Sequence, residues 1–325
     1  MTIYTNFIGI DIGKHELVIG IHGNKSSKSF PNTQEGFDSF FSQYELSLNE
    51  ALVVLETTGG YEKLFLKNFL KKKISVHRAN TRQVKAFVKS LGNKGKTDAL
   101  DAIALARYGY ERHDRLTLYK PVEETLETLQ SLAQRRLDLN QLLVQEKNRN
   151  QSPDNCHFVK KSCNEMIKTI QEQIQKVTKE IEDRVEQSPE LIQKRKILMT
   201  IPGVGPITSL LLVILLPELG HLNRRQIASL VGLAPYPNES GTKIGYRRTK
   251  GGRQEVRSIL FMAGMAASKS KSSLGEKNRK MVESGKKKMV ALVATMRKIV
   301  VIANAKIKQY LQKDAAVVEP CGNGS

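Results

Sequence analysis

Four carboxylates occupy positions that suit metal-dependent phosphodiester chemistry. Asp11 ends one apolar, strand-like run, and Glu56 ends another. Asp98 and Asp101 are three residues apart, a spacing that places both side chains on one face of a helix. Four acids brought together repel one another unless a cation lies among them, and such oxygen ligands suit Mg²⁺ or Mn²⁺. Two such ions about 4 Å apart can activate a nucleophile and stabilise the leaving oxygen of a phosphodiester.

Each acid taken alone also has an ordinary structural explanation. Asp11 can be a turn residue at a strand end, and Thr97 followed by Asp98 and Asp101 is typical of a capped helix N-terminus. The order of strand, strand and helix is what favours a common site. We therefore predict that Asp11, Glu56, Asp98 and Asp101 form a catalytic metal site.

Ser240 is a second candidate for chemistry. It lies before Gly241, which allows an exposed turn, and before a run of basic residues. A serine hydroxyl becomes a nucleophile only with help from a base, a metal or positive charge, and arginines can hold a phosphate through two parallel hydrogen bonds. We expect residues 235–252 to form a polar loop. The predicted nucleic-acid contacts in and after it are Arg247, Arg248, Lys250, Arg253 and Arg257.

A glycine-rich turn between two apolar segments, Pro202 to Pro206, has the pattern of a helix-hairpin-helix turn. In such a turn Gly203 and Gly205 would let backbone N–H groups approach a DNA phosphate at a helix N-terminus. The alternative is a tight connection between two helices with no ligand.

The elements that would position the first four acids alternate between strand and helix patterns. Strands are predicted near residues 7–10, 17–21, 28–30, 51–55 and 74–77, and helices near 36–44, 61–70, 82–91 and 97–108. This α/β pattern covers residues 1–120.

The remainder of the chain has a helical pattern. Residues 121–190 contain no glycine, and Ile167, Ile170, Ile174, Val177 and Ile181 follow the alternating three- and four-residue spacing of a coiled-coil seam. A helical hairpin is predicted there, packed either within the chain or between two chains. Residues 191–313 are predicted to be mainly helical, with helices near 195–201, 207–216, 224–231, 256–267 and 288–311, and residues 314–325 a disordered tail.

The charge of the chain indicates a polyanionic partner. Its net charge is +20, and residues 241–313 carry 19 Lys and Arg against three acids. Nucleic acid is the commonest partner of such a field, although a basic protein can also use its charge only for solubility. Because the charge is concentrated in one part of the chain, we favour nucleic-acid binding.

Cysteine use and hydropathy exclude several classes of protein. Three cysteines at unrelated spacings, Cys156, Cys163 and Cys321, form no disulfide or metal framework. The longest apolar run, Leu210–Leu216, is far shorter than the roughly 20 residues that span a bilayer, and the N-terminus has no signal-peptide pattern. We expect a cytoplasmic protein associated with the bacterial nucleoid and with no membrane partner.

The phrases around the acids and the serine resemble the DEDD transposases of the IS one-ten and IS eleven-eleven insertion-sequence families, which are related to the pilin-gene DNA invertases. The matching stretches are Gly9–Lys14, Glu56–Gly59, Lys96–Ala102 and Gly232–Arg257. The resemblance implies a RuvC-like ribonuclease H fold at the N-terminus, with Asp11, Glu56, Asp98 and Asp101 as the metal-binding tetrad. The helical coiled-coil middle would be followed by a C-terminal transposase domain whose serine matches Ser240.

The same resemblance implies a mechanism and partners. The serine would become covalently linked to DNA, with serine and tetrad on opposite sides of the cleaved phosphate and drawn from different subunits of a homodimer or tetramer. Donor and target DNA would be the substrates, and a non-coding bridge RNA would guide the reaction. The basic charge agrees with binding of both nucleic acids without requiring it.

Three functions remain open on the sequence alone. The first is a transposase or recombinase that uses the tetrad and Ser240, including a DNA invertase. The second is a RuvC-like Holliday-junction nuclease that uses metal and water and has no need of Ser240. The third is a non-catalytic nucleic-acid-binding protein whose acids are only turn and cap residues.

Overall fold

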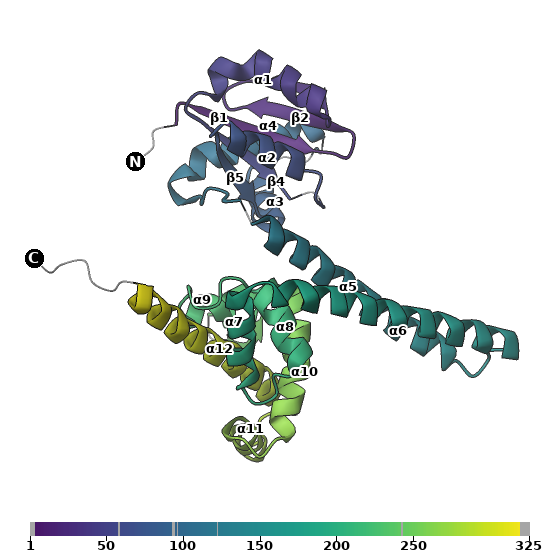
Figure 1. The fold of residues 1–325 in the computed structure, drawn as a ribbon. Coiled ribbons are helices and arrows are strands. Elements are labelled where there is room, and N and C mark those ends of the chain that lie inside the picture. Colours follow the sequence, from purple (N-terminus) through teal and green to yellow (C-terminus); the bar gives the residue numbers. More distant parts are fainter. Residues whose placement is uncertain are drawn as a thin grey trace, which may run out of the picture. The chain divides into compact units, whose positions relative to one another are not determined.

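The structure is a computed structural model that describes residues 4–318, apart from residues 58, 93, 94, 96, 122 and 242 and the side chains of residues 243, 244 and 315–318. Cys321 and the last part of the predicted tail, residues 319–325, lie outside the described residues. The chain divides into two compact units, Met1–Val122 (unit 1) and Glu123–Ser325 (unit 2), which are described separately (Figure 1).

Unit 1 is built on a mixed sheet of five strands in the order β3-β2-β1-β4-β5. The central strand β1 (Asn6–Ile12) pairs antiparallel with β2 (Glu16–Ile21) and parallel with β4 (Ala51–Glu56). At the edges, β3 (Ser27–Pro31) is antiparallel to β2 and β5 (Ser75–Ala79) is parallel to β4. The predicted order of three strands followed by two further strands separated by helices is confirmed.

One face of this sheet is covered by α1 (Gln34–Leu48) and α2 (Lys63–Lys71). Four phenylalanines from the two helices are fully buried with the inward residues of β1 and β4, and these are Phe37, Phe40, Phe65 and Phe69. Strands covered on both faces read as continuous apolar runs rather than as alternating ones, and this explains the unbroken hydrophobic stretches of β1 and β4.

The other face packs on α3 (Thr81–Ser90) and α4 (Asp98–Arg112), which is followed by the short 3-10 helix η1 (His113–Arg115). Glycines let α4 approach the sheet closely. A Cβ added at Gly9 of β1 would lie 2.1 Å from the carbonyl oxygen of Ala102 and 2.3 Å from the backbone nitrogen of Ala106. Gly9 therefore fixes the distance between β1 and α4.

We expect Gly9→Ala to destabilise unit 1 by about 3 kcal/mol, because overfilled, well-packed contacts force the backbone to move. Urea unfolding followed by circular dichroism measures this effect. Gly95→Ala is the matched control, since a Cβ there would lie 3.6 Å from Leu100 Cδ1, an ordinary contact. Equal stability of the two variants would show that α4 adjusts freely on the sheet.

Unit 2 begins with two long helices, α5 (Glu124–Asn150) and α6 (His157–Glu186), that lie side by side as a helical hairpin (Figure 1). Arg136 donates a hydrogen bond from Nε to Thr178 Oγ1 over 2.8 Å, and Asn150 Nδ2 donates to Asn164 Oδ1 over 2.9 Å. The two helices thus pack on each other within one chain, which is the first of the two alternatives that the seam left open.

The rest of unit 2 is mainly helical and shares its core with this hairpin. Leu129 and Ala133 of α5 and Ile181 and Val185 of α6 are buried in the same hydrophobic cluster as the C-terminal helices. Residues 121–190 and 191–313 therefore belong to one compact unit. The C-terminal helices are α7 (Pro189–Met199), α8 (Pro206–Leu215), α9 (Arg224–Val231), α10 (Gln254–Lys269), α11 (Ser273–Glu283) and α12 (Lys288–Val318).

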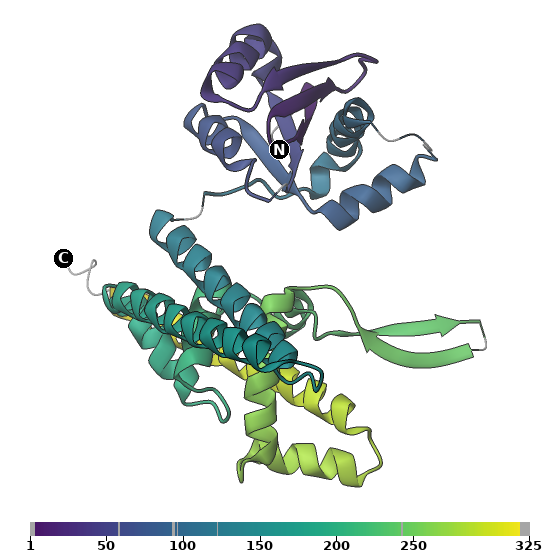
Figure 2. The ribbon, with the colours of Figure 1, turned by 90° about the vertical axis from the view of Figure 1, so that its right-hand side faces the viewer.

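Three features of unit 2 differ from the sequence-based expectation. The predicted loop at residues 235–252 is instead an antiparallel hairpin of β6 (Pro235–Ser240) and β7 (Lys243–Thr249), which projects from the helices in Figure 2. Helix α11 was not predicted, and α12 continues to Val318, five residues into the predicted tail. Over the part of the chain that is described, no helix is both long and apolar enough to cross a membrane.

Candidate active site

Asp11 and Glu56 are neighbours at the carboxyl ends of two parallel strands. The register pairs Ile10 of β1 with Leu55 of β4, so the next residue of each strand is the carboxylate. Successive side chains alternate between the faces of a sheet. Ile10 and Leu55 point into the cluster under α1 and α2, and Asp11 and Glu56 therefore lie on the opposite face, which α4 covers. Both acids are half-buried.

The direction of α4 carries its first turn to the same edge of the sheet. A Cβ at Gly109, near the end of α4, would lie 3.6 Å from Phe7 at the start of β1, whereas Ala102 lies against Gly9. The helix thus runs antiparallel to β1. Asp11 is two residues beyond Gly9, about 6.6 Å along the strand. Asp98 is four residues before Ala102, about 6 Å along the helix axis.

The first turn of α4 is held by its cap. Thr97 has extended backbone angles, and its Oγ1 accepts a hydrogen bond from the N–H of Leu100 over 3.2 Å, which is the predicted capping interaction. Asp98 is exposed and Asp101 is half-buried. Both carboxylates are favoured at a helix N-terminus whether or not they also bind a cation.

The four acids have the donor chemistry for a hard divalent cation, and their strands and helix bring them to one edge and one face of unit 1. Their side chains do not converge as a ready-made cage, since among the described residues no three His, Cys, Asp or Glu side chains stand close enough together to hold a metal. A hollow beside this edge is lined by Asp98 together with Gly13, Lys14, His15 and Glu16. Mg²⁺ keeps several waters and takes only one or two protein carboxylates directly, so an open arrangement fits it.

Glu62 is a buried acid near this edge that the sequence analysis did not identify. Its side chain is fully buried, and its carboxylate accepts hydrogen bonds from the Gly60 N–H over 2.9 Å and from Arg78 Nη2 over 2.6 Å. Glu62 thereby ties the Gly59–Gly60 turn, which follows Glu56, to strand β5. No local signal marks Glu62, because its partner Arg78 lies 16 residues further along the chain, on β5.

We expect Glu62→Gln to lower the free energy of unfolding by about 2 kcal/mol, since a buried hydrogen bond to a charged group is worth about 1.5–3 kcal/mol. It should also slow DNA cleavage by loosening the turn after Glu56. Glu111→Gln on α4 is the control, because Glu111 forms an exposed ion pair with Arg107, and such pairs contribute at most about 1 kcal/mol. Equal losses in both variants would contradict the anchoring role of Glu62.

Ser240 lies at the tip of the β6–β7 hairpin. It is the last residue of β6, pairs in register with Lys243, and is followed by Gly241 with φ +55°. Every residue of β6 is exposed, and within the described part of the chain the Ser240 hydroxyl makes no hydrogen bond. The hairpin thus presents this hydroxyl to solvent.

The predicted basic contacts separate into two groups. Arg247, Arg248 and Lys250 are exposed, on or directly after β7. Arg253 instead donates hydrogen bonds to the carboxylate of Glu218 and to the carbonyl of Leu215. Half-buried Arg253 is thus engaged within unit 2.

Arg257 and Gly203 are likewise engaged in internal packing. The Arg257 guanidinium donates to the carbonyls of Val231 and Gly251, so it braces the base of the hairpin. Gly203, at φ +86°, packs so closely on α10 that a Cβ would lie 2.3 Å from the carbonyl oxygen of Ala263. Of the two turn glycines, Gly205 at the start of α8 faces open space.

Comparison with known protein families gives two matches, one over the segment that contains the four acids and one over the segment that contains Ser240. A transposase family of the DEDD, IS110 type matches residues 8–152, and a second, described as "Transposase IS116/IS110/IS902 family", matches residues 195–280. The chain carries the transposase domains of the IS110 family. It is a DNA strand cleavage and transfer enzyme whose substrate is DNA, and the DEDD family implies a divalent metal.

Two full-length relatives extend the similarity over nearly the whole transposase. "Pilin gene-inverting protein" from Moraxella lacunata is 29% identical over 322 residues, covering 96% of this chain and 99% of the relative. The protein of the same name from Moraxella bovis has the same identity and coverage. The similarity to each relative thus spans both units of the chain.

Proposed function

We propose that this transposase breaks and rejoins DNA strands with two sets of residues, a DEDD carboxylate site in unit 1 and a serine nucleophile in unit 2. The carboxylate site is supported chiefly by one observation: Asp11 and Glu56 lie next to each other on the sheet face that α4 covers. The first turn of α4 adds Asp98 and Asp101 at the same edge. This is the arrangement expected of a RuvC-like ribonuclease H domain.

Asp11, Glu56, Asp98 and Asp101 would hold Mg²⁺ or Mn²⁺ together with the DNA phosphate. Bound there, the metal would supply charge stabilisation for a phosphodiester under attack. The contribution of the chain is to keep four carboxylates at one edge and to fix α4 through Gly9 and Thr97.

Ser240 would be the nucleophile that conserves the energy of the broken bond. Its Oγ attacks phosphorus, the bond from phosphorus to one nucleoside oxygen breaks, and the proton of the serine hydroxyl passes to the oxygen that leaves. A DNA hydroxyl then attacks the phosphoserine, and Oγ is released and reprotonated. Each step therefore breaks one phosphodiester bond and forms another, first between serine and DNA and then between two DNA strands. The exposed position of Ser240 at the hairpin tip supports this role.

The experiment that tests the proposal is a plasmid recombination assay with the purified full chain, its element ends and Mg²⁺. Recombinant product should form, and removal of the metal with EDTA should stop it. Linear cleavage products without any rejoined DNA would instead favour a metal-dependent nuclease.

We further propose that the transposase acts as a homo-oligomer guided by a bridge RNA. The net charge of +20 supports simultaneous binding of RNA and DNA. RNA copurified from cells that carry the element should be enriched in one non-coding sequence from that element. Recovery of only bulk cellular RNA would contradict guidance by RNA.

DNA inversion is a second candidate reaction, favoured by the full-length similarity to the two pilin gene-inverting proteins. Inversion requires the same cleavage and rejoining but acts on two sites within one DNA molecule. A plasmid that carries the element ends in inverted orientation distinguishes the two, because an invertase flips the intervening segment whereas a transposase moves it to a new site.

A further inference from the structure

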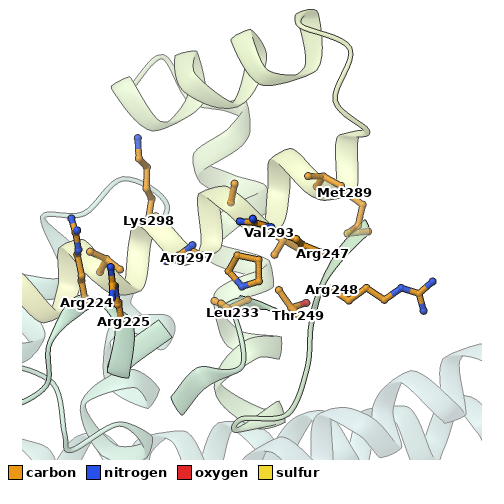
Figure 3. A pocket seen from close by; sticks show the side chains of 14 residues that line it. Arg224, Arg225, Leu233, Arg247, Arg248, Thr249, Met289, Val293, Arg297 and Lys298 are labelled. Carbon is orange, nitrogen blue, oxygen red and sulfur yellow. The ribbon is translucent and has the colours of Figure 1, made fainter. Parts of the chain in front are cut away.

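Unit 2 contains a hollow of about 920 Å³ where the start of α9, the strand β7 and the helix α12 meet (Figure 3). We call it the basic hollow. Six of its fourteen lining residues are cationic, and none is acidic. The cationic residues are Arg224 and Arg225 of α9, Arg247 and Arg248 of β7, and Arg297 and Lys298 of α12.

The rest of the lining is almost entirely apolar. Leu233 is buried beneath the hollow and Val293 is half-buried, whereas Met289 and Val290 are 58% and 54% exposed. An apolar surface that stays open to solvent beside arginines is typical of a binding site rather than of a core.

The cations of the basic hollow are not neutralised from within the protein. Within the described part of the chain, none of the six forms an ion pair, whereas nearby Arg253 is paired with Glu218. Lys298 is exposed, and partial desolvation, followed by the neighbouring ammonium of Lys277, lowers its pKa. An anionic ligand in the basic hollow would therefore meet arginines that no carboxylate of the protein already pairs with.

We infer that the basic hollow binds an unpaired nucleobase of a single-stranded nucleic acid, with the flanking phosphates on its arginines. A duplex keeps its bases stacked inside and offers phosphates but few free apolar faces, so the apolar lining would be left without a partner. A single strand supplies both an anionic phosphate and the apolar face of an unpaired base. Grooves that bind single strands likewise combine positive charge along the backbone with surfaces that contact the bases. The volume also falls within the range of about 300–1,000 Å³ typical of ligand pockets.

The basic hollow is separate from the serine. It lies at the base of the hairpin, where Pro235 pairs with Thr249, whereas Ser240 pairs with Lys243 at the tip. Five residues of strand separate Pro235 from Ser240, about 17 Å. Resting on the proposed function, the inference is that a strand held in the hollow is positioned several nucleotides from the phosphate that Ser240 attacks.

The test measures the affinity of the full chain for three fluorescent probes by anisotropy: oligo-dT and oligo-U of about 12 nucleotides, the length of a typical single-strand site, and a DNA duplex. Val290→Glu places a carboxylate at the mouth of the hollow and should weaken single-strand binding about ten-fold, because the charge repels phosphate and opposes an apolar contact. Duplex affinity should change much less. Gln309→Glu, an exposed position further along α12, adds the same charge and should have little effect.

A second pair of variants tests the phosphate contacts without altering the apolar lining. Arg297→Gln should lower the log–log salt dependence of single-strand binding by about 0.7, the value for one phosphate, and exposed Lys308→Gln on the same helix should not. Comparison of oligo-dT with oligo-U identifies DNA or RNA as the preferred source of the strand.

The outcomes separate this inference from the proposed function. Equal weakening of single-strand and duplex binding by Val290→Glu would overturn the basic hollow as a base site. So would a control variant, Gln309→Glu or Lys308→Gln, with an effect as large as that of the variant it is matched to. If recombination by the wild type still proceeded, the proposed function would stand. Photocrosslinking of 5-iodouracil gives a further check. The adduct should map to residues lining the hollow, above all the segment 289–298. An adduct found only in the part of the hairpin beyond the hollow, residues 237–246, would overturn the inference.

Discussion

Asp11→Asn is expected to abolish DNA cleavage in Mg²⁺ while nucleic-acid binding stays intact or becomes tighter. The change removes one carboxylate from the pair formed with Glu56 at the carboxyl ends of β1 and β4. Metal stabilisation of a phosphoryl transition state is worth several kcal/mol, which corresponds to about a thousand-fold in rate. Binding tightens because a negative charge near the phosphate is removed.

The matched control is Asp38→Asn in the same unit. Asp38 is exposed on α1, and its carboxylate accepts a hydrogen bond from Gln34 Nε2 over 3.1 Å. Loss of this carboxylate should leave cleavage unchanged. Single-turnover cleavage of a labelled element end measures both variants. Retained cleavage by Asp11→Asn would contradict the assignment of the carboxylate site.

Ser240→Ala is expected to eliminate strand transfer with almost no effect on folding or binding. An exposed hydroxyl without a hydrogen bond contributes little to stability, within about ±0.5 kcal/mol, and Ser240 is such a residue among those described. Strand transfer is lost because hydrolysis by water at a metal site leaves no covalent protein–DNA phosphodiester. Without that phosphodiester, no high-energy bond remains to drive the rejoining step. Ser240→Cys should keep slight activity, since a thiolate is nucleophilic but larger.

Ser258→Ala is the control for the serine. Ser258 is exposed on α10 in the same unit, and its hydroxyl donates to the Gln254 carbonyl over 3.1 Å, so recombination should be normal. Normal recombination by Ser240→Ala itself would mean that the serine mechanism is wrong, and a nuclease that uses only metal and water would be the better account.

Much of unit 1 could be predicted from the sequence because its signals are local. The continuous apolar runs of β1 and β4 mark buried strands, and the acids at their ends stand out against those runs. Thr97 followed by two acids identifies the start of α4 from neighbouring residues alone. The prediction that Asp11 and Glu56 lie at one sheet edge followed from the order of the strands, which the structure confirms.

The features that escaped prediction depend on long-range contacts or lack periodicity. Strand β6 contains two prolines and is exposed throughout, so it shows no alternation of apolar and polar residues, and the hairpin was predicted as a loop. Arg253 looks like a surface cation until its partner Glu218, 35 residues away, is seen. Gly203 looks like a phosphate-binding glycine until α10 is found against it.

The covalent intermediate is the most direct test of the account. Wild-type transposase incubated with an end-labelled element and Mg²⁺, then denatured and digested, should give a DNA adduct that mass spectrometry maps to the peptide holding Ser240. The adduct should be absent with EDTA and absent from both Asp11→Asn and Ser240→Ala. Efficient cleavage by the wild type without any protein–DNA adduct, or an adduct at another residue, would contradict the serine mechanism.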